Sequence, residues 1–394
     1  MCARTHSGDD LGLRRWPAEA ISADTEGLGR ALKVIGVAGA HGTTTTSCLI
    51  ASILTTAGHR IGILGSVGYS DGRRVGRAPA SPWAPDRLAR WLGRLVRNGC
   101  SHAVMEVSEE SLEPCQLAGL DFDVACVTGL GGDRRDGDRS DGDRGAATDR
   151  ASPVWLLEHL APEGLAVLNA DDPGAAGLLG RTEGPVLTVA MRSPAEITAT
   201  ILDRSVAELT FLLVAGAEAM PVRTRMIGTR HVDACLAAAA VGLAYGLDLP
   251  MVARGLEAVD YVPGQLERIE CGQPFSVFVD NARTPGALAA CFEALREVVT
   301  GRIVCVLGVG DEAPDVALLA QTVEAGADLA ILTTDDRAEA IARALGQARA
   351  GDAVLIAGNG YPGRRSAGRK RVRLDDGEVA RSWLYREQGL GIRD

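Results

Sequence analysis

Lysine is almost absent from this chain. The 394 residues include 41 lysines and arginines together, of which only Lys33 and Lys370 are lysines. Acidic residues outnumber basic ones, which gives a formal net charge of −10 at pH 7. Nucleic acid and acidic membrane surfaces repel such a charge, so we expect no nucleic-acid partner.

Long apolar runs and paired cysteines are missing too. No run approaches the roughly eighteen apolar residues of a membrane span, and the N-terminus has no apolar stretch typical of a signal peptide. The nine cysteines include no C-x-x-C pair, which argues against a zinc site. We therefore expect a cytoplasmic protein with reduced thiols and no membrane span.

What the chain does contain is a phosphate-binding loop without its usual lysine. An apolar strand pattern over 34–38 leads into a glycine-rich loop, and a helical pattern follows it. This arrangement presents backbone N–H groups and a helix N-terminus to phosphate. The lysine that normally neutralises the β- and γ-phosphates is replaced by Thr43. The candidates for nucleotide binding here are Gly39, His41, Gly42, Thr43, Thr44 and Thr45. A tight turn that needs the two glycines for its backbone alone explains the pattern equally well.

Strand and helix patterns alternate along the rest of the chain, which predicts an α/β fold with a mainly parallel sheet covered on both faces. We expect a lead-in over 1–33, a central domain over 34–260 and a second domain over 261–394. Within the central domain, 131–150 consists of Gly, Asp, Arg and small residues. This predicts a flexible low-complexity loop, and the alternating charges favour solvation over metal binding. Three short alternating segments between 197 and 225 predict a small antiparallel region.

Six motifs, in order along the chain, resemble those of the Mur ligase family, most closely its UDP-N-acetylmuramoyl tripeptide synthetase branch. They are the loop itself, 105–108, 168–173, 262–264, 279–285 and 356–360. The resemblance implies a central P-loop ATPase-like domain followed by a C-terminal Rossmann-like domain. It also implies ATP and Mg²⁺ as cofactors of a reaction that joins a carboxylate to an amine. We expect no counterpart of the family's N-terminal UDP-binding domain, because residues 1–33 are too few for one.

The resemblance also assigns roles to single positions. Thr44 and Glu106 match magnesium-binding positions, and Asp280 matches a nucleotide-binding aspartate. By contrast, Thr43 stands at the loop lysine and Ser152 near the carbamylated lysine, while the stretch from Asp133 to Asp136 lacks the metal-binding histidine. Loss of one cation from phosphoryl transfer costs roughly 10³–10⁵ in rate.

We therefore expect a catalytically impaired or inactive Mur ligase homologue with no assigned catalytic residue. Its role would be that of a binding or regulatory partner of an active Mur ligase or another cell-wall enzyme. The alternative is an active ATP-dependent ligase with a reorganised site. A third hypothesis, a nicotinamide oxidoreductase, rests on the G-x-G-x-x-A pattern of Gly308–Ala313. Asp311 and Glu312 of that pattern would repel a pyrophosphate.

Overall fold

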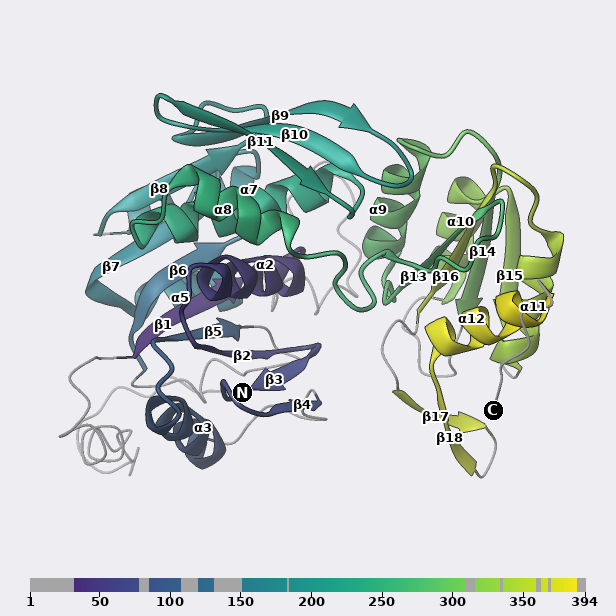
Figure 1. The fold of residues 1–394 in the computed structure, drawn as a ribbon, viewed down its shortest axis with the longest axis horizontal. Helices are drawn as coiled ribbons and strands as arrows, with labels where there is room; N and C mark the ends of the chain where they lie inside the picture. The colour runs from purple at the N-terminus through teal and green to yellow at the C-terminus, as the bar shows by residue number, and fades with distance from the viewer. Residues whose placement is uncertain are drawn as a thin grey trace.

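The computed structural model of this protein describes residues 32–77, 85–107, 120–130, 151–182, 184–308, 316–333, 336–358, 363–367 and 370–387. The chain folds into two lobes that lie side by side, each built on its own sheet with helices on both faces (Figure 1). The expected lead-in and the 131–150 loop fall outside the described residues, apart from positions 32 and 33.

The first lobe contains a sheet with the strand order β11-β10-β9-β8-β7-β6-β1-β5-β2-β3-β4. Its strands are β1 (Lys33–Ala38), β2 (Ile61–Gly65), β3 (Gly68–Ser70), β4 (Val75–Arg77), β5 (His102–Glu106), β6 (Phe122–Val127), β7 (Leu160–Asn169), β8 (Val186–Ala190), β9 (Ile197–Arg204), β10 (Leu209–Ala215) and β11 (Glu218–Thr224). The strands from β2 to β9 in this order pair in parallel, while β3–β4 and β10–β11 extend the two edges antiparallel. The central strands are buried on both faces, which suits near-continuous apolar runs such as β1.

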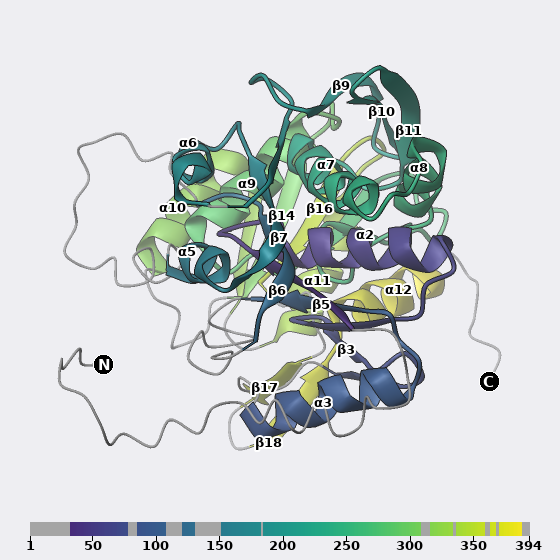
Figure 2. The same ribbon diagram turned by 90° about the vertical axis from the view of Figure 1, so that its left-hand side faces the viewer.

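Helices cover both faces of this sheet. One face packs against α2 (Thr43–Thr56), α7 (Thr229–Ala244) and α8 (Leu249–Glu257), and the other against α3 (Pro85–Arg97) and α5 (Ala151–Glu158). Figure 2 shows α2 and α3 on opposite sides of the β5 edge. A short helix, α6 (Pro173–Ala176), and a 3₁₀ turn, η2 (Leu179–Arg181), follow β7. Helix α8 begins at Leu249 because Asp248 caps it, accepting a hydrogen bond from the Met251 N–H at 2.8 Å.

The second lobe has a five-stranded sheet with the order β12-β13-β16-β14-β15. Its strands are β12 (Glu267–Arg268), β13 (Ser276–Asp280), β14 (Ile303–Gly308), β15 (Leu329–Thr333) and β16 (Ala353–Ala357). Helices α9 (Pro285–Arg296) and α10 (Val316–Gly326) pack on one face, and α11 (Arg337–Gln347) and α12 (Asp376–Glu387) on the other. A separate hairpin joins β17 (Gly363–Ala367) to β18 (Lys370–Leu374). All pairs except β12–β13 in the main sheet are parallel, and the predicted α/β fold class is confirmed.

The expected antiparallel region corresponds to β9, β10 and β11, which form an extension of the large sheet. The sequence patterns missed β3 and β4, which are three residues long and too short for a period to be recognised. Within the described residues, no helix is long and apolar enough to cross a membrane.

Candidate functional site

The glycine-rich loop lies where β1 ends and α2 begins, at the carboxyl ends of the parallel strands. Gly42 immediately precedes α2 and has φ +77°, a left-handed conformation that favours glycine. Gly39 is needed for space as well, because a Cβ there would lie 2.2 Å from Thr128 Oγ1. The sequence therefore specifies this loop through its two glycines, whatever the loop binds.

Neighbouring backbone after β6 fixes the loop in place. The Ala40 N–H donates to the Gly129 carbonyl at 2.9 Å, and Thr128 Oγ1 donates to the His41 carbonyl at 2.6 Å. The His41 side chain is exposed, whereas Thr44 and Thr45 are buried. Gly42 provides no side-chain cap for α2. The first turn of α2 thus keeps the general capacity of a helix N-terminus to attract an anion.

Glu106 is the centre of the polar contacts around this loop. It ends β5, directly beside β1, where it pairs in register with Val37. Its Oε1 accepts hydrogen bonds from Thr43 Oγ1 at 2.8 Å and from Thr44 Oγ1 at 2.7 Å. Its Oε2 accepts from the Ser66 N–H at 2.7 Å and from Ser66 Oγ at 3.0 Å. These four bonds match the lone-pair capacity of one carboxylate.

Ser66 is the site residue that the sequence patterns missed. It follows β2, the strand that pairs with β5, so its hydroxyl reaches Glu106 and lies 2.9 Å from Thr44 Oγ1. Gly65 makes this approach possible, because a Cβ there would lie 2.6 Å from Glu106 Oε2. In the sequence, Ser66 is marked only by a Gly-Ser pair after a strand pattern. Such pairs are too common to identify a functional site.

Asp280 forms its hydrogen bonds inside the second lobe. At the end of β13, its Oδ1 accepts from the Ala282 N–H and its Oδ2 from the Leu266 N–H, each at 2.7 Å. Burial raises the pKa of this carboxyl to about 6, against the lowering effect of these hydrogen bonds. Leu266 has φ +45°, so the carboxylate stabilises a strained turn. The candidate residues thus divide into one cluster at the loop and a separate aspartate.

The loop cluster offers hard oxygen donors of the type that suits a magnesium ion, and the loop itself contains no lysine. Thr44 Oγ1 and the Glu106 carboxylate are hard oxygen donors, the kind that Mg²⁺ prefers. A triphosphate also needs a cation beside its β- and γ-phosphates. Thr43 holds the lysine position, its hydroxyl is directed at Glu106, and no lysine occurs between Lys33 and Lys370. Among the described residues, no group of three or more His, Cys, Asp or Glu side chains is placed to hold a metal ion.

Several positions to which the family resemblance assigns a role lie outside the described residues. The stretch from Asp133 to Asp136 lies outside the described residues, as do Asp311, Glu312 and Ala313 of the dinucleotide-like pattern. Ser152 belongs to α5.

A phosphate loop at the end of a parallel sheet, followed by a second α/β lobe, defines a two-lobed α/β protein of the phosphate-loop class. Residues 37–242 match the Mur ligase middle domain, and residues 264–340 match the Mur ligase glutamate ligase domain. The chain belongs to the Mur ligase family.

Curated relatives support the same assignment. The chain is 32% identical to UDP-N-acetylmuramoyl-L-alanyl-D-glutamate--2,6-diaminopimelate ligase of Geobacillus kaustophilus, over 91% of this chain and 80% of that protein. It is also 32% identical to UDP-N-acetylmuramyl-tripeptide synthetase of Roseiflexus sp., over 92% of this chain and 80% of that protein.

Solved structures share the fold. A UDP-N-acetylmuramoyl-L-alanyl-D-glutamate--2,6-diaminopimelate ligase superposes with a TM-score of 0.70 at 24% identity, covering 95% of this chain and 83% of the other. Folylpolyglutamate synthase of Mycobacterium tuberculosis superposes with a TM-score of 0.65 at 19% identity, covering 95% of each chain.

Proposed function

We propose that this protein is a Mur ligase homologue impaired in ligation, which acts by binding rather than by catalysis. The observation that carries the proposal is the hydrogen bonding at Glu106, where the hydroxyl of Thr43 replaces the loop lysine and donates to the carboxylate. A lysine there would place a positive charge beside the phosphates, whereas a threonine hydroxyl places none.

The energetic argument concerns the charge that develops during phosphoryl transfer. Catalysis of this reaction depends mostly on positioning and on neutralising that charge. By analogy with an arginine finger, whose absence costs roughly 10³–10⁵ in rate, loss of the loop cation would correspond to about 4–7 kcal/mol of activation free energy. The chain has the glycines that the loop needs and the apolar core beneath it. The fold can therefore form even if the ligation reaction is slow.

As the bound partner we propose an active Mur ligase or another enzyme of cell-wall precursor metabolism. The support is that relatives are named for muramoyl-peptide ligation. Affinity capture with the full chain, followed by identification of the captured proteins, tests this part separately from catalysis.

The test of impaired ligation compares this chain with the Geobacillus kaustophilus relative under the same conditions. Both are assayed for ADP release and amide formation with Mg²⁺, ATP, a UDP-muramoyl dipeptide and a panel of amino acids. We expect the chain to turn over at least about 10³-fold more slowly. Turnover within tenfold of the relative would overturn the proposal.

A lysine substitution adds a readout that does not depend on turnover. We expect Thr43→Lys to increase the rise in melting temperature that Mg-ATP produces, because a ligand bound only by the folded state stabilises it. Thr200→Lys is the matched control, since it adds a lysine at an exposed position of β9, in the antiparallel extension of the sheet. Equal shifts in the two variants would show that position 43 is not the missing countercharge.

The second candidate function is an active ATP-dependent ligase with a reorganised site. It is favoured by the retained contact between Thr44 and Glu106 and by the uncapped start of α2. It predicts that Mg-ATP stabilises the unmodified chain and that Thr44→Ala removes this effect. Absence of any nucleotide-dependent shift in the unmodified chain would exclude it.

A further inference from the structure

An open, largely polar surface cavity lies at the opposite ends of the strands from the phosphate loop. It has a volume of about 730 Å³ and opens beside the starts of β2 and β5. Its walls come from the end of α2, from β2, from the turn after β3 and from the segment after α3. Helices α2 and α3 lie above and below this edge of the sheet in Figure 1. The loop contacts at Glu106 are at the other end of β5.

Apart from Ile61, the side chains that line this cavity can donate hydrogen bonds, and one carries a permanent positive charge. They include Thr55, His59, Arg60, Ser70 and Ser101. No aspartate or glutamate belongs to this lining in the part of the chain that the structure describes. Gly58, Gly72 and Gly99 also line the cavity, and the wall has no side chains at these three positions.

Two histidine rings lie beside the hydroxyl of Ser101, one of the groups that line the cavity. Ser101 Oγ lies 2.9 Å from His102 Nδ1 and 3.4 Å from His59 Nδ1. The ring centroids of His59 and His102 are 4.8 Å apart in an edge-to-face arrangement. Because the hydroxyl has a single proton, it cannot donate to both rings at once. The same oxygen lies 3.5 Å from the Arg60 carbonyl, to which it can also donate, so the serine proton is directed at one of these three neighbours.

Asp71, which lies between the lining residues Ser70 and Gly72, has its carboxylate bound by its own surroundings. Asp71 Oδ1 accepts from the N–H groups of Arg73 and Arg74 at 3.2 and 2.9 Å, and its Oδ2 lies 3.5 Å from Arg94 Nε. Arg60 is anchored through Nη1, which donates to the Asn98 carbonyl at 2.6 Å. The guanidinium is thus fixed at the rim, and its remaining donors leave it able to bind a further acceptor. A locally positive cavity on a chain of net charge −10 calls for a specific explanation.

We propose that this cavity binds a small oxyanion, namely the phosphate group of a metabolite or free phosphate. The guanidinium of Arg60 supplies charge and directional donors, and Thr55 and Ser70 supply hydroxyl contacts. The site is separate from the phosphate loop and does not depend on whether the protein ligates.

The experiment follows the histidine side chains of the full chain by NMR, with ¹⁵N-labelled histidine and addition of inorganic phosphate. The chain has six histidines, and His59→Gln identifies the ring signals of interest. We expect the His59 and His102 signals to shift with phosphate but not with sodium chloride of equal ionic strength. A phosphate monoester, glycerol 2-phosphate, is tested in parallel, and tighter binding of the ester would identify a metabolite as the ligand.

Variants of Arg60 make the test decisive. We expect Arg60→Gln to weaken phosphate binding about tenfold or more, because charge-assisted hydrogen bonds are lost. Arg60→Lys keeps the positive charge, and we expect it to retain most of the affinity for phosphate. It provides a second readout if the Arg60→Gln variant does not fold. Arg254→Gln, at an exposed position of α8, is the control and leaves binding unchanged. Ring signals that do not respond to millimolar phosphate, or equal affinity in Arg60→Gln and Arg254→Gln, would overturn the proposal.

Discussion

His231 is buried near the start of α7, with its ring surrounded by uncharged groups. Its Nε2 lies 2.9 Å from Thr224 Oγ1 and 3.4 Å from Cys235 Sγ. Among the described residues, no hydrogen-bond partner reaches its Nδ1. Burial lowers the pKa of this histidine to about 4. A second proton would place an unpaired charged N–H in the core, so the folded state keeps the ring neutral.

This burial gives a pH dependence of known sign. In the unfolded chain the ring titrates near 6.5, so between pH 6.5 and 4 the unfolded state binds more protons and stability falls as pH falls. From pH 7 to pH 5 we expect the free energy of unfolding to decrease by about 2 kcal/mol more in the unmodified chain than in His231→Asn. Urea unfolding at the two pH values measures this difference.

The control for this comparison is His159→Asn, at a half-buried position whose Nδ1 lies 2.9 Å from the Trp155 carbonyl. The other histidine with a pKa lowered to about 4, His102, is present in every variant and cancels in the difference. An unchanged pH dependence in His231→Asn would show that the folded state accepts the second proton.

At the loop, the sequence predicted the components but not their connections. The resemblance placed Thr44 and Glu106 at one site, and they are hydrogen-bonded. The resemblance identified Thr43 only as the residue that replaces the loop lysine. It did not predict a hydrogen bond between Thr43 and Glu106. That contact depends on the register of β1 beside β5 and on Ser66 approaching from β2. Such relations between neighbouring strands are not encoded in the spacing of one segment.

At the scale of elements, α2 packs closely against α7 and α8 because these helices present glycines to it. A Cβ at Gly242 would lie 2.9 Å from Ile53 Cγ2, and a Cβ at Gly255 would lie 2.4 Å from Ile53 Cα. Ser52 Oγ also donates to the Gly255 carbonyl at 2.7 Å. The helix that carries the phosphate loop is thus held by contacts that leave no room for one methyl group.

We expect Gly255→Ala to lower the free energy of unfolding by about 1–3 kcal/mol, because backbone of α2 must move away from the new methyl group. Gly286→Ala is the matched control in helix α9, where a Cβ meets no heavy atom within 4 Å. The control should be stabilising by about 0.4–1 kcal/mol, since alanine restricts the unfolded chain. Urea unfolding of both variants gives the comparison, and equal effects of the two substitutions would refute the close packing of α2 and α8.

Helical and strand periods predicted most elements of the two sheets. In a long amphipathic or fully apolar segment, the spacing of the apolar residues indicates which faces of the element are buried. Helix α7 begins at Thr229, three residues before the apolar pattern begins at Val232, since polar positions of a first turn carry no period. Strand β7 begins at Leu160, well before its own continuous apolar stretch at 165–168. In both cases the missing residues are held by neighbouring elements, a tertiary effect that local patterns do not contain.

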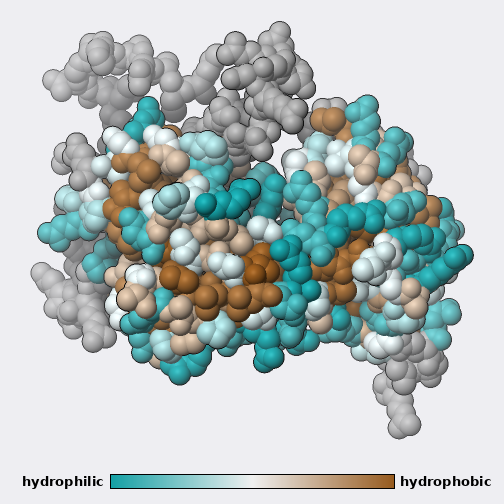
Figure 3. All heavy atoms as spheres, turned by 90° about the horizontal axis from the view of Figure 1, so that it is seen from above, coloured by the Kyte–Doolittle hydropathy of each residue, from teal (hydrophilic) through white to brown (hydrophobic). Residues whose placement is uncertain are grey.

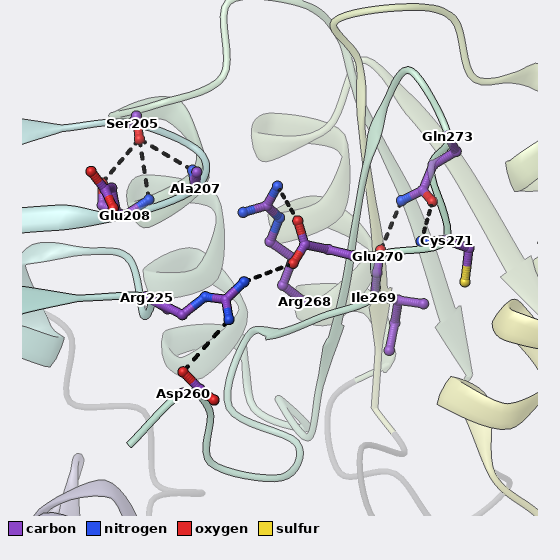
Figure 4. Close-up of polar contacts among 10 residues, drawn as sticks. All are labelled: Ser205, Ala207, Glu208, Arg225, Asp260, Arg268, Ile269, Glu270, Cys271 and Gln273. Carbon is purple, nitrogen blue, oxygen red and sulfur yellow. Dashed lines mark hydrogen bonds and ion pairs between the residues drawn. The ribbon is translucent and has the colours of Figure 1, made fainter. Parts of the chain in front are cut away.

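At the scale of the whole molecule, the lobes meet through apolar and polar contacts. Ile227, between β11 and α7, belongs to the core cluster of the second lobe. Hydrophilic side chains gather where the lobes meet on the face shown in Figure 3. Arg225 lies between Asp260 at 3.6 Å and Glu270 at 3.1 Å, and Arg268 lies 2.8 Å from the same glutamate (Figure 4).

A second polar contact between the lobes centres on Glu297, directly after α9. Its Oε2 accepts from Arg204 Nη1 at 3.0 Å, and its Oε1 accepts from Thr229 Oγ1 at 2.8 Å. The Arg204 side chain is 41% exposed and that of Glu297 is 25% exposed. Solvent therefore screens the ion pair, and its contribution should be small.

A double-mutant cycle with Arg204→Ala and Glu297→Ala measures this contact between the lobes. From urea unfolding of the four proteins we expect a coupling energy of about 0.5–1 kcal/mol that decreases as salt is added. The control cycle replaces Glu297→Ala by Glu293→Ala, one helical turn earlier at an exposed position of α9, and should be additive. Equal coupling in the two cycles would mean that Arg204 senses only the general charge of α9. A zero coupling at Glu297 would contradict an energetic contribution from this ion pair, which joins the end of β9 to the residue directly after α9, 93 positions apart in the chain.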